Sequence, residues 1–181
     1  MIDVYAIVRH PTPPLPAPLH LVADGDLALA VAPACDDEVT PESLWRHEEV
    51  VEALMEDRDV LPVRFGTRLG GDAEARQIIS ERRDEFLRTL TLLAGGVELS
   101  VRAVAPCDDD AAEAVHEQLD GLARDSRRRP PHGAEALRAA YLVDRGAIER
   151  FTGCVAALQR RHSRLQLLCT GPWPPYTFAQ P

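Results

Sequence analysis

The sequence predicts an α+β fold in two lobes. Runs of alternating apolar and polar residues, typical of strands, are interspersed with longer segments whose apolar residues recur at helical spacing. The second half has the order strand, helix, strand, helix, strand, which resembles a ferredoxin-like sandwich with one strand missing or altered. We therefore expect an N-terminal α+β domain over residues 1–95 and a C-terminal modified ferredoxin-like βαβ domain over residues 96–181.

The first half opens with a predicted strand and hairpin. Residues 1–8 alternate as a strand does, and the proline-rich residues 11–18 can form neither a helix nor a central strand. Residues 19–31 predict a hairpin, because two apolar runs flank the tight-turn pair Asp24-Gly25.

Two helices are expected next. The first covers residues 41–57, because Thr40 offers a side-chain cap and Pro41 loses nothing at the first helical position. The second covers residues 72–93 and stops at Gly95-Gly96. The positions expected on their buried faces are Leu44, His47, Val51 and Leu54 in the first helix and Ile79, Phe86, Leu90 and Leu93 in the second.

Between these helices lies the run Val60–Thr67, which reads VLPVRFGT. Its apolar residues predict a buried strand, and Pro62, which has no N–H to donate, places that strand at a sheet edge or a bulge. Arg64 is the one charge in the run. It either extends past the sheet edge into water or forms a specific ion pair or contact site.

The second half continues with strands and helices joined by charged loops. A loop is expected at residues 127–133, and the aromatic tail 171–178 closes the chain. The remaining elements expected are a strand at 97–103, a helix at 109–122, a strand at 137–143, a helix capped by Asp144 that carries Ile148 to Leu158, and a strand at 165–169.

Composition excludes several classes of function. The net charge of −9 and the pI near 5.1 oppose binding to phosphate backbones, so no nucleic-acid partner is expected. No leader and no membrane-spanning stretch is recognised, which leads us to expect a soluble, cytoplasmic protein with no membrane partner. The four cysteines are scattered without CxxC spacing, so free thiols are expected.

No catalytic motif is complete. The zinc-protease pattern fails after His47-Glu48 and after His116-Glu117, because Val51 and Asp120 stand where the second histidine is needed. Phosphate-binding and nucleophile-elbow motifs are absent. We therefore expect a protein without enzymatic activity, metal or cofactor. The alternative hypotheses are a hydrolase that uses a His47/Glu48 dyad and a small-molecule sensor.

Taken together, certain stretches resemble the gas vesicle synthesis proteins of the GvpF/GvpL family. They are His47-Glu48 on a helix, Val60–Thr67, Tyr141-Leu142-Val143 and the tail Gly171–Phe178, which reads GPWPPYTF. They occur in family order over nearly the whole chain, and the LPxRFGT and GPWPPY signatures are specific in combination. The chain departs from the family in its compact connection from Asp125 to Ala136.

The resemblance implies a two-domain α+β protein with a non-enzymatic, accessory or minor structural role in gas vesicle assembly. It implies that the partners are the small, apolar shell protein and other gas vesicle accessory proteins, and that the protein is found in the cytoplasm and at the gas vesicle. The alternative is a ferredoxin-like regulatory protein that binds a small molecule. The residues we expect to contact the shell protein are Arg64, Phe65, Trp173, Tyr176 and Phe178; for the three tail aromatics the competing expectation is that they fold back onto their own lobe.

Overall fold

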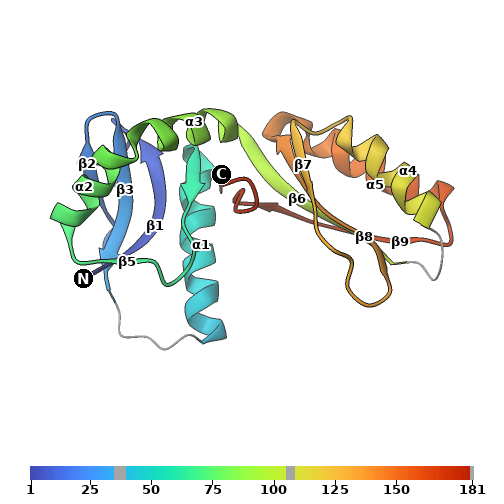
Figure 1. Cartoon of the computed structure of the whole chain (residues 1–181), viewed down its shortest axis with the longest axis horizontal. Coiled ribbons are helices and arrows are strands. Elements are labelled where there is room, and N and C mark those ends of the chain that lie inside the picture. Colours follow the sequence, from blue (N-terminus) through green and yellow to red (C-terminus); the bar gives the residue numbers. More distant parts are fainter. Residues whose placement is uncertain (35–39, 105–108, 180–181) are drawn as a thin grey trace. The chain divides into compact units, whose positions relative to one another are not determined.

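The computed structural model describes residues 1–34, 40–104 and 109–179, and its fold is α+β with two antiparallel sheets (Figure 1). The chain forms two units: unit 1 is residues 1–94 with the segment from Phe178 onward, and unit 2 is residues 95–177. Phe178 therefore groups with unit 1, although residues 96–181 were expected to form the second domain.

The elements of unit 1 are β1 (Ile2–Arg9), β2 (His20–Asp24), β3 (Leu27–Pro33), α1 (Pro41–Asp57), β4 (Val60–Pro62), β5 (Arg68–Leu69), α2 (Asp72–Glu81) and α3 (Arg83–Leu93). The elements of unit 2 are β6 (Gly96–Val104), α4 (Asp109–Asp120), β7 (Asp125–Arg128), β8 (Glu135–Asp144), the 3₁₀ turn η1 (Arg145–Ala147), α5 (Ile148–Arg161) and β9 (Gln166–Trp173).

The sheet of unit 1 has the order β2-β3-β1-β4, and β5 also pairs with β1. Every residue of β3 from Leu27 to Ala32 is buried. Since successive side chains of a strand point to opposite faces, both faces of this sheet are covered. Helix α1 packs against β1 and β4, α2 against β2 and β3, and α3 against β1 and β4.

Strand β4 lies at the edge of this sheet, as Pro62 predicted. Pro62 is paired with Ala6 of β1, and its missing N–H interrupts no interior ladder. The observed strand is shorter than the apolar run, because β4 ends at Pro62 and strand geometry resumes only at Arg68 in β5.

Two expectations about the helices of unit 1 are wrong. The single helix expected over residues 72–93 is two helices, α2 and α3, because Arg82 leaves helical geometry with φ −112° and ψ 17°. Leu44 was expected on the buried face of α1 but is 45% exposed. The buried residues of α1 are Ser43, His47, Val51, Leu54 and Met55.

Unit 2 is a complete ferredoxin-like βαββαβ domain with no strand missing. Its antiparallel sheet has the order β7-β8-β6-β9, with α4 and α5 on one face (Figure 1). The strand that sequence analysis missed is β7, which lies where a loop was expected from residue 127 and pairs with Ala139–Leu142 of β8. It is an edge strand, and charged residues such as Arg127 and Arg128 are typical of exposed edges.

The core of unit 2 lies between its sheet and the helices α4 and α5. Its largest members include Leu99, Tyr141, Phe151 and Leu165. None of the helices in the described parts of the chain is long and apolar enough to cross a membrane.

Candidate functional site

The segment between β4 and β5 forms a tight turn at residues 64–67. The carbonyl of Arg64 accepts from the backbone N of Thr67 at 3.2 Å and from its Oγ1 at 2.8 Å. Gly66 has φ 81°, a left-handed conformation that glycine adopts without steric cost. The sequence FGT therefore closes a turn with a positive φ at its third position, the requirement of a type II turn.

Both ends of this turn are fixed to β1. The N–H of Val63 donates to the carbonyl of Tyr5 at 2.9 Å, and the N–H of Val4 donates to the carbonyl of Thr67 at 3.0 Å. The pairing of β1 with β3 shifts register between Val4 and Ala6, so Tyr5 lies at a bulge.

The imidazole of His47 in α1 supports the turn from inside. Its Nε2 lies 2.8 Å from the carbonyl oxygen of Val63, and because a carbonyl only accepts, Nε2 carries the proton. The ring stacks on Tyr5 with centroids 4.9 Å apart and meets Phe65 edge-on at 5.6 Å. Burial lowers the pKa of His47, and this outweighs the opposing effects of the Val63 hydrogen bond and Asp3. The imidazole is therefore neutral at pH 7.

A hollow of about 60 Å³ lies beside this cluster, lined by residues that include Asp3, Ser43, His47, Phe65 and Arg68. This volume admits a few water molecules. It is well below the roughly 300 Å³ of a metabolite pocket. The hollow is bordered by an ion pair between Arg68 Nε and Asp3 Oδ1 at 2.8 Å.

The turn presents Arg64 to solvent. Its side chain is exposed, and among the described residues its guanidinium has no hydrogen bond or ion pair. The side chain thus extends past the sheet edge into water and forms no ion pair with a described residue, and its contact with a partner stays a prediction. Phe65 is half-buried against His47, so the two residues form one exposed feature on a fixed backbone.

Sequence analysis missed Trp45, which is 65% exposed on α1, next to the 45% exposed Leu44. Large exposed apolar side chains of this kind favour contact with a partner. Helical geometry could have indicated this exposure, because Trp45 lies about half a turn away from the buried residues Ser43 and His47.

The tail begins within β9. Gly171 has φ 117°, and a Cβ built there would lie 2.7 Å from the carbonyl oxygen of Glu98. Beyond the strand, the buried carboxylate of Glu98 holds Thr177: Oε2 accepts from its N–H at 2.9 Å and Oε1 from its hydroxyl at 2.7 Å. Arg129 donates to the same hydroxyl at 2.8 Å.

The structure distributes the three tail aromatics differently. Trp173 is 39% exposed and its indole N–H donates to Thr170 at 3.3 Å, whereas Tyr176 is half-buried. Phe178 is only 2% exposed and groups with unit 1. Four of the five expected residues thus form two features, Arg64 with Phe65 in unit 1 and Trp173 with Tyr176 in unit 2, whereas Phe178 is buried.

The remaining candidate groups have structural roles. Nδ1 of His116 shares a hydrogen bond with the hydroxyl of Tyr141 at 2.8 Å, and burial raises the pKa of that hydroxyl. Cys154 and Cys169 carry free thiols, while Cys35 and Cys107 lie outside the described residues. Across the described ranges, no three His, Cys, Asp or Glu residues gather where they could hold a metal ion.

These features define a two-unit α+β protein with a ferredoxin-like second unit, and solved structures share this fold. The crystal structure of gas vesicle protein GvpF from Microcystis aeruginosa matches with a TM-score of 0.86 at 18% identity, covering 99% of both chains. That of GvpF from Anabaena sp. PCC7120 matches with a TM-score of 0.85 at 19% identity, covering 99% of this chain and 96% of the other.

Sequence comparison identifies the family. Gas vesicle protein F2 of Halobacterium salinarum is 29% identical over 153 residues, which cover 79% of this chain and 70% of the relative. Gas vesicle protein F of a Streptomyces species is 26% identical over an alignment 235 positions long, covering 98% of each chain. The family described as "Gas vesicle synthesis protein GvpL/GvpF" matches residues 3–111 and 104–180. The chain belongs to this family, whose members take part in gas vesicle formation.

Proposed function

We propose that this protein aids gas vesicle assembly by binding the apolar shell protein and promoting its incorporation, without catalysing a reaction. The observation that carries this proposal is the turn at residues 64–67, which places an exposed Arg64 and a half-buried Phe65 on a rigid sheet edge. An aromatic residue beside an arginine on a fixed backbone is typical of the residues that dominate binding energy at interfaces.

Rigidity favours binding because little conformational freedom remains to be lost. Hydrogen bonds from the turn to β1 and the ring of His47 already fix this backbone. An apolar shell subunit must be kept from aggregating before it is added to the vesicle, and an acidic, highly charged partner that covers part of it would serve that purpose.

The proposed contact surface is Arg64 and Phe65, with Trp173 and Tyr176 as a second contact. Trp45, on α1, is an additional anchor of the kind found at the centre of interfaces. Phe178 is left out of the proposed contact surface, because its side chain is only 2% exposed.

The geometry around His47 supports a non-enzymatic role. The Nε2 proton is committed to the carbonyl of Val63, and the adjacent hollow of about 60 Å³ does not fit a metabolite. The same size argument weighs against the alternative of a small-molecule sensor acting at this place. We place the protein in the cytoplasm and at the gas vesicle, with the shell protein and other accessory proteins as partners.

The test is a pull-down of purified shell protein by the parent chain and by variants. Arg64→Ala, Phe65→Ala and the pair Trp173→Ala/Tyr176→Ala are compared with Arg150→Ala, an exposed residue of α5. We expect Arg64→Ala or Phe65→Ala to reduce capture by about tenfold, the loss typical of removing an interface anchor, with Arg150→Ala unchanged. Full capture by all three test variants would reject this choice of surface, and no capture by the parent chain would reject the function.

A further inference from the structure

We propose that the face of the unit 2 sheet turned away from α4 and α5 contains a carboxylate-binding site that takes an acidic side chain of a partner polypeptide. This site lies entirely in unit 2, goes beyond the proposed function and does not depend on Arg64 or Phe65. It is formed by residues of β6 and β8 together with Arg129.

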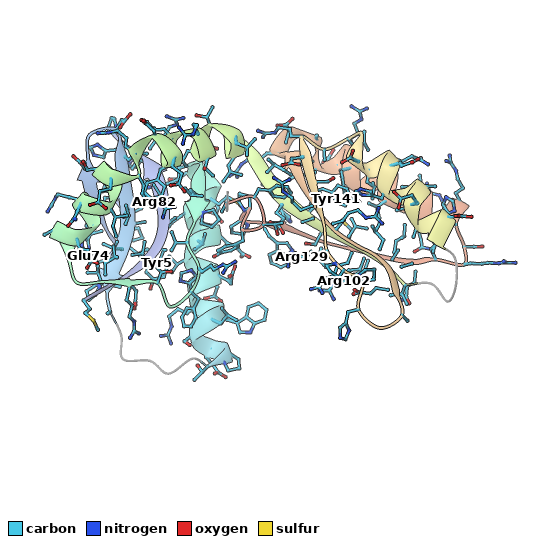
Figure 2. The ribbon with its side chains drawn as sticks, in the orientation of Figure 1. Tyr5, Glu74, Arg82, Arg102, Arg129 and Tyr141 are labelled. Carbon is cyan, nitrogen blue, oxygen red and sulfur yellow. The ribbon has the colours of Figure 1, made fainter. Side chains whose placement is uncertain are left out.

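The alternation of β6 places its polar residues on one face. Leu99 and Val101 belong to the core under the helices, so Glu98, Ser100 and Arg102 point the other way. Figure 2 shows Tyr141 on the side of the helices and Arg102 and Arg129 on the opposite side.

Two arginines lie directly opposite each other on this face. Arg102 of β6 and Arg138 of β8 are register partners in the antiparallel sheet. Directly paired side chains have Cβ atoms about 5 Å apart, and like charges at such positions repel. Arg102 has one long ion pair, with Glu135 at 3.8 Å, whereas Arg138 has no side-chain hydrogen bond or ion pair to any described residue. An anion bound between the two guanidinium groups would remove this repulsion.

The arginines line a hollow of about 70 Å³, together with Glu98, Ser100 and Arg129. Three guanidinium groups and one carboxylate give the lining a formal charge of +2, in a chain whose net charge is −9. The Glu98 carboxylate is already occupied, because both of its oxygens accept hydrogen bonds from Thr177. Among the described residues, Arg138 and the hydroxyl of Ser100 have no side-chain partner, and Arg102 has only its long ion pair with Glu135.

Size and charge select the ligand. A hollow of about 70 Å³ accommodates one carboxylate group but not a metabolite, which needs roughly 300 Å³. Guanidinium groups bind carboxylates through two parallel hydrogen bonds. A nucleic acid would be repelled by the rest of this acidic chain, whereas a polypeptide can present a single carboxylate at the hollow. An acidic polypeptide segment is therefore the occupant that we propose.

The experiment measures binding of a fluorescein-labelled peptide with a single Glu among Ser and Gly residues by fluorescence anisotropy, using the full chain. A peptide with Gln in place of Glu is the matched control. We expect the Glu peptide to bind at least about tenfold more tightly at low salt, since charge-assisted hydrogen bonds are much stronger than neutral ones. The pair Arg102→Gln/Arg138→Gln should abolish this difference, whereas Arg150→Gln/Arg161→Gln on α5 should leave it unchanged.

A gain of affinity provides a test that misfolding cannot imitate. Glu135→Gln removes the carboxylate that competes for Arg102, and its amide oxygen can still accept from the N–H of His132. We expect the Glu peptide to bind about two- to threefold more tightly to this variant. The proposal would be overturned if the Glu and Gln peptides bound equally well, or if the arginine pairs on the sheet and on α5 lost the same affinity for the Glu peptide when replaced. It would also be overturned if inorganic phosphate bound tightly and the Glu peptide did not bind.

Discussion

Replacing His47 by alanine tests whether the turn at residues 64–67 is held from inside. The substitution removes the hydrogen bond to Val63, worth about 1 kcal/mol, and the ring contacts with Tyr5 and Phe65, worth about 1 kcal/mol each. The cavity left by the imidazole adds about 1 kcal/mol more. We expect the free energy of unfolding of unit 1 to fall by about 3–4 kcal/mol.

Urea denaturation followed by circular dichroism measures the total loss, and hydrogen exchange locates it. Exchange is needed because the two units need not unfold in a single transition. Peptides that cover residues 60–69 should lose protection more than peptides of β6 or β8, since the hydrogen bonds of the turn depend directly on His47.

Trp45→Ala is the matched control, because it truncates a large side chain on the same helix. Trp45 is 65% exposed, so its removal should change the free energy of unfolding by no more than about 0.5 kcal/mol. A loss below about 1 kcal/mol for His47→Ala, or an equal loss in the two variants, would show that the imidazole does not hold the turn.

Three further outcomes are expected. Burial lowers the pKa of His47 from 6.5, so on acidification the histidine is protonated in the unfolded chain before it is protonated in the folded one. The free energy of unfolding of unit 1 should therefore fall below about pH 6.5, by up to about 1.4 kcal/mol per pH unit. Urea titrations of His47→Gln at several pH values should show a smaller pH dependence. Gly171→Ala should lower the free energy of unfolding of unit 2 by about 3 kcal/mol, because of the positive φ and the clash with Glu98. Gly153→Ala, with open space around its Cβ in α5, should raise it by about 0.5–1 kcal/mol. Melting temperatures that change in the same direction in both variants would refute this reasoning. Glu98→Leu should cost about 2 kcal/mol, because it leaves the N–H of Thr177 without its acceptor, and unchanged exchange at Thr177 would refute that role.

The edge position of β4 was predictable because a single chemical fact determines it. Proline has no N–H, so a strand containing Pro62 is excluded from the interior of a sheet in almost any fold. The type II turn after it follows in the same way from Gly66, whose φ of 81° is accessible to few other residues. Local chemistry of this kind does not depend on tertiary contacts.

Strand β7 was missed because its pairing is decided elsewhere in the chain. Residues 125–128 read DSRR and have no apolar alternation, so they match a charged loop as well as a strand. Their backbone is held by β8, whose own alternation is clear. Charged edge strands carry little signal of their own, since their side chains prevent further pairing and do not fill a core.

Three of the four positions expected on the buried face of α1 are buried, and only Leu44, next to the exposed Trp45, is wrong. Leu44 and His47 lie three positions apart and fit a common stripe, yet at the start of the helix Ser43 is buried and Leu44 is exposed. Since Ser43 also completes the cap with Thr40, its burial follows from the helix start and not from its polarity. Periodicity therefore predicted the helix and most of its buried face, but not which residue of the first turn is buried.

The candidate site in unit 2 could not be found without the register of its sheet. Arg102 and Arg138 are 36 positions apart, and nothing in either neighbourhood indicates that they face each other. Their repulsion exists only because β6 and β8 pair with this alignment, and a shift by one residue would direct one arginine into the core. The core residues Leu99, Val101 and Tyr141 exclude such a shift, so the packing of one face of the sheet holds the two charges together on the other.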